Sequence, residues 1–133
     1  MWVFTPGQNS DASWQEYCDA IRAAARIDHP APFGLQVIAP GSSDPPATWR
    51  RSIALAAAEV GERAAIAIVS RSVVVRGVLT AISWIRPPRY TLSMVATLDE
   101  AVALADAGAP GRGKRARELV ERMLGSPQSF RIP

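Results

Sequence analysis

The sequence AAIAIVSRSVVVRGVLTAISWIRPPRYTLSMVATLDEAVALA, at residues 64–105, decides the fold class of this chain. Residues 63–69 form an apolar run without alternation, which is typical of a central strand covered on both faces. Residues 90–96 alternate around their apolar positions and indicate another strand. Thr97 and Glu100 then have the spacing of a capping box that begins a helix. Strands and helices that alternate in this way predict a parallel sheet.

Residues 70–85, between these two strands, have features of both kinds of element. Three consecutive valines favour a strand, whereas the spacing of Val74, Val78 and Ile82 is helical. The segment is longer than a typical strand. We therefore predict a helix that ends before Pro87.

The rest of the chain continues the alternation in both directions. Ser13 with Glu16 has capping-box spacing for a first helix, and Asp44 is expected to cap a second one. Outside 63–96, strands are expected at 2–5 and 33–39, and helices at 13–25, 44–60, 98–107 and 115–124. The prediction is one α/β domain at 1–125, with about four strands in a mostly parallel sheet flanked by helices, an extra C-terminal helix, and a tail at 126–133.

Trp49 and Trp84 both align with the apolar stripes of their expected helices. Because such stripes face the sheet, we predict that both indoles are core residues.

Composition and charge exclude several classes of protein. The chain has 133 residues, 48% hydrophobic and 20% charged, which suits one globular domain. Its net charge of +3 is too small to indicate a nucleic-acid or membrane surface. Charged residues such as Arg71 and Arg76 interrupt the apolar stretches, so no membrane span is expected. Cys18 is the single cysteine and no signal peptide is evident, so we expect a cytoplasmic protein. Fourteen arginines beside one lysine indicate a GC-rich bacterial genome.

No motif of the chain indicates catalysis. Residues 108–114 match the first seven positions of the phosphate-binding pattern GxxxxGK, but Arg115 stands where a Ser or Thr must ligate Mg²⁺. A helix, and not a strand, is expected before this stretch, so we interpret it as a linker between helices. The only histidine, His29, lies in a proline-rich loop, and Cys18 is expected on an apolar helix face. We expect no enzyme activity, metal or cofactor.

The best candidate site lies where two predicted strands end. Ser42 and Ser43 follow the strand at 33–39, and Arg71 and Arg76 follow the central strand. The carboxyl ends of parallel strands meet at one edge of a sheet, where helix N-termini attract anions. These four residues are therefore candidates for a regulatory or anion-binding site. The alternative is an ordinary helix-capping turn, with arginines whose stems cover apolar surface.

The quoted stretch also resembles the STAS or SpoIIAA-like group of small bacterial α/β domains. The similarity is carried by AIAIVS, SVVVRGVLTAISWI, YTLSMVAT and LDEAVALAD. It implies a domain that binds a protein partner or a ligand without catalysis. In the anti-sigma antagonists of this group, a serine in an Asp-Ser-Ser-Gly-like turn is phosphorylated to release a kinase-like partner. Residues 42–44 resemble that turn, although no glycine follows the serines.

We therefore expect a non-catalytic protein-interaction or regulatory module. The alternative is a small-molecule, lipid or anion-binding domain of the same fold, because a crevice at the strand ends near Ser42, Arg71 and Arg76 could hold an anion.

Overall fold

A computed structural model describes residues 1–4, 7, 9–27 and 31–124. The elements are β1 (Trp2–Phe4), α1 (Asp11–Ala25), β2 (Phe33–Ile38), α2 (Ala47–Ala58), β3 (Ala65–Val69), α3 (Val73–Ile85), β4 (Thr91–Val95), α4 (Leu98–Gly108) and α5 (Arg112–Leu124). The strands form one parallel sheet in the order β1-β2-β3-β4. The predicted fold class is confirmed, with α5 as the added C-terminal helix. His29 and the tail predicted at 126–133 lie outside the described residues.

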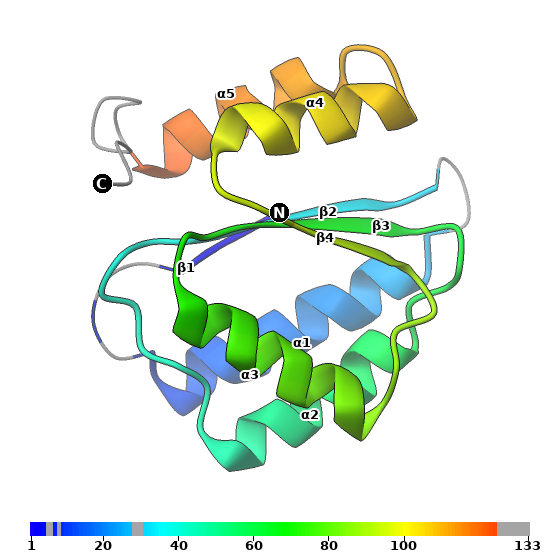
Figure 1. The fold of residues 1–133 in the computed structure, drawn as a ribbon. Helices are drawn as coiled ribbons and strands as arrows, with labels where there is room; N and C mark the ends of the chain where they lie inside the picture. Colours follow the sequence, from blue (N-terminus) through cyan, green and yellow to red (C-terminus); the bar gives the residue numbers. More distant parts are fainter. Residues whose placement is uncertain (5–6, 8, 28–30, 125–133) are drawn as a thin grey trace.

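The sheet separates two layers of helices. α1, α2 and α3 cover one face, and α4 and α5 cover the other (Figure 1). Strand order follows chain order, and right-handed crossovers that all run in one direction place their helices on the same face. α4 follows the last strand and is free of that constraint.

Each face of the sheet has its own apolar core. Phe4, Trp14 and Ile53 are among the residues of the core beneath α1–α3. On the opposite face, Val37 and Val69 belong to the core that α4 and α5 cover. β3 pairs with strands on both sides, so the predicted central strand is confirmed.

The predicted caps of two helices, α1 and α2, differ from the observed ones. α1 begins at Asp11, because the Ser10 hydroxyl accepts a hydrogen bond from the Ser13 N–H at 3.2 Å. The capping box expected at Ser13 is therefore wrong. α2 begins at Ala47 after Pro46, which makes no side-chain cap, so the cap predicted at Asp44 is also wrong. Pro45 and Pro46 cause the later start of α2, because the residue before a proline is disfavoured in the α region.

The remaining predicted helices are present, although the one expected from residue 70 begins at Val73. Residues Val73–Ile85 are helical, and the Ser72 hydroxyl caps α3 by accepting from the Val75 N–H at 3.3 Å. The capping box of Thr97 and Glu100 is present at the start of α4.

The GxxxxGK-like stretch forms the turn between α4 and α5 and the start of α5, which begins at Arg112, ahead of the predicted 115. Gly111 takes a positive φ of 81° in this turn. The Gly113 N–H donates to Asp106 Oδ1 at 2.8 Å. The stretch therefore joins two packed helices, and the element before it is a helix.

The two tryptophans predicted to be buried have different environments. Trp84 is 82% exposed, so its prediction is wrong. Val75 and Ile82 are the buried residues of α3, and Trp84 lies two positions beyond Ile82, which turns it to the opposite side of the helix. Trp49 is half-buried and packs against the core beneath α1–α3.

Candidate functional site

Backbone hydrogen bonds connect the loops after β1 and β2 at the carboxyl edge of the sheet. The Gly7 N–H donates to the Gly41 carbonyl at 2.9 Å, and the Ser43 N–H donates to the Gly7 carbonyl at 2.9 Å. Both glycines have positive φ angles, 102° and 81°, which other residues rarely adopt. These bonds fix the position of the segment that carries both candidate serines.

Both serine hydroxyls take part in this loop structure. Ser42 Oγ donates to the Ala39 carbonyl at 2.7 Å and lies 3.1 Å from the Phe4 carbonyl. Ser43 Oγ accepts from the backbone N–H of Asn9 at 3.0 Å and from its side-chain amide at 3.3 Å. A change at either hydroxyl therefore acts on the connection between the two loops.

A cleft of about 480 Å³ lies between the loops that follow β2 and β3, and we call it the edge cleft. Its polar lining residues are Ser42, Asp44, Ser70, Arg71 and Ser72. The Ser70 hydroxyl is buried and accepts from the Ser72 N–H at 3.2 Å, which fixes the start of α3. The charged lining residues are one arginine and one aspartate, so the cleft has no strong excess of either sign.

The four predicted site residues do not form one group. Ser42 and Arg71 line the edge cleft, whereas Ser43 lines a separate cavity and Arg76 lies exposed on α3. The regulatory and anion-binding roles of these residues stay predictions.

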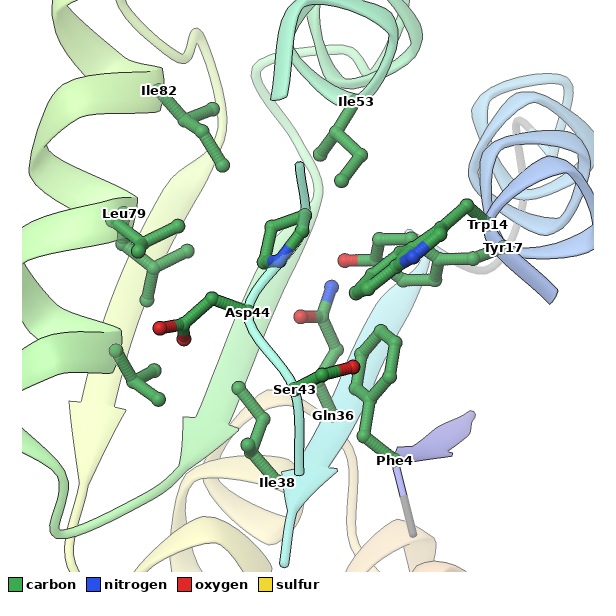
Figure 2. Close-up of a pocket in the computed structure, with 13 residues that line it drawn as sticks. Phe4, Trp14, Tyr17, Gln36, Ile38, Ser43, Asp44, Ile53, Leu79 and Ile82 are labelled. Carbon is green, nitrogen blue, oxygen red and sulfur yellow. The ribbon is translucent and has the colours of Figure 1, made fainter. Parts of the chain in front are cut away.

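A second hollow, which we call the Trp14 cavity, lies between the sheet and helices α1–α3. Its volume is about 50 Å³. Figure 2 shows Trp14 and Tyr17 of α1 on one side, Leu79 and Ile82 of α3 on the other, and Gln36 of β2 between them. Residues 43–45 run across the front of the cavity. It is therefore an apolar space that contains a few buried polar groups.

The polar groups of the Trp14 cavity differ in whether they have an interaction partner. The Gln36 side chain interacts with the Tyr17 hydroxyl. Burial, with a smaller contribution from Tyr90, raises the pKa of Tyr17 well above its usual range, so the phenol stays protonated at neutral pH. The indole Nε1–H of Trp14, by contrast, is buried and has no hydrogen-bond partner among the described residues.

The single cysteine is unsuited to nucleophilic chemistry. Cys18 is buried in the core beneath α1–α3. Burial raises the pKa of its thiol, although the nearby Arg22 acts in the opposite direction. Since the thiolate is the reactive form, this environment favours an inert thiol.

The third feature is the outward side of α3, which we call the α3 outer face. Its members are the exposed residues of this helix: Val73, Val74, Arg76, Gly77, Thr80, Trp84 and Ile85. Val73 is 80% exposed and Trp84 82%, and Val74 and Ile85 are more than half exposed. Steps of three and four residues align Val73, Gly77, Thr80 and Trp84 on one side of the helix.

The described part of the chain contains neither a cluster of metal ligands nor a helix that could span a membrane. Within it, no group of three or more His, Cys, Asp or Glu side chains is placed to hold a metal ion. Among its helices, none combines the length and the apolar character that crossing a bilayer requires.

Comparison with known proteins gives no relative. No protein-family model, curated protein or solved structure matches this chain. The resemblance to STAS domains therefore stays a prediction, and the function has to be argued from the geometry.

Sequence reasoning did not find the α3 outer face or the Trp14 cavity. A signal for the first was present, because α3 has apolar residues on more sides than one sheet-facing stripe requires. Val73 and Trp84 lie off the stripe of Val78 and Ile82. The cavity has no such signal, since it depends on how side chains from three helices and the sheet meet.

Proposed function

We propose that this chain is a non-catalytic protein-interaction module that binds its partner through the α3 outer face. The observation that carries the proposal is the exposure of four large apolar side chains on one helix, Val73, Val74, Trp84 and Ile85. Exposed apolar side chains concentrated on one element are a feature of interaction sites. Tryptophan is also enriched among the residues that dominate binding energy at protein interfaces.

The charges around this face favour an acidic partner. Residues 63–98 contain no aspartate or glutamate but five arginines, of which Arg63 and Arg71 already interact with other residues. Arg76 lies on the α3 outer face and Arg86 directly follows the helix. Arg89 forms an ion pair with Glu62 at 2.6 Å, so its charge is already balanced. The partner that fits is a protein with an apolar groove bordered by carboxylates, because complementary charges at the rim guide association.

The shape of the face supports binding along the helix. Gly77 lies between Val73 and Trp84, and there is open space where a Cβ would be. Glycine inside a helix is unfavourable by roughly 0.5–1 kcal/mol relative to alanine. The absence of a side chain here leaves room beside the helix for a side chain of the partner.

Site-specific photo-crosslinking in the native cell tests the proposal. A photoreactive phenylalanine analogue replaces Trp84 in one variant and Leu104, an exposed residue of α4 on the opposite face, in the control. We expect a crosslinked partner at position 84 that is absent at position 104. The purified partner should then bind the purified chain, and binding should weaken with rising salt concentration.

Two pairs of variants locate the interface in the purified complex. Trp84→Ala and Arg76→Glu should each weaken binding at least tenfold, a loss of about 1.4 kcal/mol or more. The matched controls Leu104→Ala and Arg122→Glu should bind like wild type. A partner that binds all four variants equally, or crosslinking at position 84 only to a second copy of this chain or to lipid, would refute the proposal.

A further inference from the structure

The Trp14 cavity contains a buried donor without an acceptor. Trp14 is 3% exposed, and its Nε1–H has no hydrogen-bond partner among the described residues. The large majority of buried polar atoms in folded proteins have a partner. An unpaired donor beside a hollow therefore points to an acceptor supplied from outside the chain.

The lining of the cavity restricts the chemistry of that acceptor. Ile53, Val78 and Leu79 are among its apolar walls, and its polar groups are few. Predominantly apolar walls with a small number of placed polar groups are typical of small-molecule sites. The carboxylate of Asp44 belongs to the same lining, and in Figure 2 it lies on the side of α3. A negatively charged ligand would be repelled by this carboxylate and would lose its hydration, so the acceptor should be uncharged.

Neighbouring hollows allow a ligand larger than the cavity itself. Two further cavities, of about 30 and 80 Å³, lie on the same side of the sheet. Tyr17 and Gln36 line all three cavities. A dry apolar cavity of roughly 150 Å³ can hold a molecule the size of benzene. A ring of that size is larger than the Trp14 cavity alone, so its binding requires these two side chains to move and join neighbouring spaces.

We propose that the Trp14 cavity binds a small, uncharged, mostly apolar molecule whose single acceptor oxygen, as in a ketone, lactone or ester, accepts the hydrogen bond from Trp14 Nε1. This site is distinct from the α3 outer face, and neither proposal depends on the other. α3 contributes its inner residues Val78 and Leu79 to the cavity and its outer residues to the docking face.

A matched pair of probes tests the proposal on the full chain. Cyclopentanone carries the acceptor oxygen, and methylenecyclopentane has nearly the same shape without it. Nuclear magnetic resonance of the ¹⁵N-labelled protein follows the four indole N–H signals, and Trp14→Phe assigns the signal of Trp14. We expect cyclopentanone to shift this signal saturably and downfield, and to bind roughly fivefold to tenfold more tightly than the hydrocarbon.

Three variants establish where the probe binds. Trp14→Phe removes the donor but keeps a ring, so the affinity for the ketone should fall to that of the hydrocarbon. Val78→Phe fills the cavity and should abolish binding of both probes, whereas Val73→Phe on the exposed side of α3 should bind like wild type. Melting curves show which variants are folded, and the comparison of the two probes on the wild-type chain needs no variant.

Two results would overturn the proposal. One is that neither probe shifts the Trp14 signal more than it shifts the signal of the exposed Trp84. The other is that the Trp14 N–H shows cross-relaxation with water and is unaffected by both probes, which means that a buried water is its partner.

Discussion

The indole Nε1–H of Trp49 donates a hydrogen bond to Oδ1 of Asp11 at 2.7 Å and thereby joins the first turn of α2 to the first turn of α1. The bond explains why Trp49 is only half-buried, because its polar edge must remain near an exposed carboxylate. We expect Asp11→Ala to destabilise the chain by about 1 kcal/mol, the usual net worth of a hydrogen bond to a charged group near the surface. A double-mutant cycle with Trp49→Phe, measured by urea unfolding, isolates the pair. Additive effects of the two substitutions would show that the bond contributes nothing.

Two helical glycines, Gly113 in α5 and Gly77 in α3, should have opposite effects on stability when they are replaced by alanine. A Cβ at Gly113 would lie 2.5 Å from Asp106 Oδ2 and 2.6 Å from the Val102 carbonyl oxygen, so Gly113→Ala should destabilise the chain by about 1–3 kcal/mol. Gly77 on α3 has open space around it, and Gly77→Ala should stabilise the chain by roughly 0.5–1 kcal/mol. Thermal unfolding of both variants checks the pair. Equal effects of the two substitutions would contradict the close approach at Gly113.

Two tryptophans should differ sharply when they are truncated. Trp14→Ala removes a buried indole that packs near Phe4, with 5.2 Å between ring centroids, and should destabilise the chain by about 3–5 kcal/mol. Trp84→Ala should change the stability of the isolated chain by less than about 0.5 kcal/mol, as is usual for exposed sites. A large loss at Trp84 would mean that the α3 outer face is covered within the chain itself.

The candidate regulatory serines should respond differently to a negative charge. Ser42→Asp replaces a donor to two carbonyl oxygens with an acceptor, so we expect a loss of about 1–3 kcal/mol. Ser43→Asp keeps an acceptor that can face the Asn9 N–H, so its effect on stability should be smaller. Chemical unfolding of the two Asp variants, with Ser42→Ala and Ser43→Ala as uncharged controls, measures the difference. Equal losses for the two Asp variants would show that these hydrogen bonds do not matter for the loop.

Alkaline pH should weaken the fold through Tyr17. Burial raises the pKa of this phenol in the folded chain above its ordinary value near 10. As pH rises above about 10, the unfolded chain releases the proton while the folded chain retains it, so the free energy of unfolding decreases. The stability that the protonated Tyr17 phenol contributes is fully present below about pH 10. Urea unfolding at several pH values should show this decrease, with a smaller slope in Tyr17→Phe.

Cys18 needs a control in the same experiment. Burial also raises the pKa of its thiol, which acts in the same direction from about pH 8.5. The comparison is therefore made in a Cys18→Ala background. Identical slopes with and without the Tyr17 hydroxyl would rule out this residue as the source of the alkaline loss.

The sequence predicted the order of elements because apolar periodicity and caps are local signals. Thr97 and Glu100 marked the start of α4, and the continuous apolar run marked β3 as central. The errors arose where two local signals competed. Ser10 and Ser13 both suit a helix cap, and the serine nearer the N-terminus is the one used. At α2 the backbone limits of two prolines outweighed the capping preference of Asp44.

The candidate site was less accessible to sequence reasoning. Ser42 and Arg71 were placed at one edge because strand ends meet there, and they do line one cleft. Ser43 directly follows Ser42 in the chain but lines the Trp14 cavity and not the edge cleft. The path of the loop decides this difference. The stripe of α3 was recognised, but its width was overestimated, and for this reason Trp84 was assigned to the core.

The strand order β1-β2-β3-β4 has a consequence for the kinetics of folding. Each strand pairs with its neighbours in the chain, so each pairing closes a loop that holds only one helix. Contacts between residues close in sequence favour rapid folding, and we expect refolding by stopped-flow fluorescence to be faster than for sheets with distant pairings. The helices α4 and α5 are synthesised after all four strands, and until they dock, Leu35, Val37 and Val69 lack the cover of these helices. The growing chain thus passes through a stage in which the face of the sheet opposite α1–α3 is open to aggregation. This stage ends when α4 and α5 have left the ribosome and docked on the sheet.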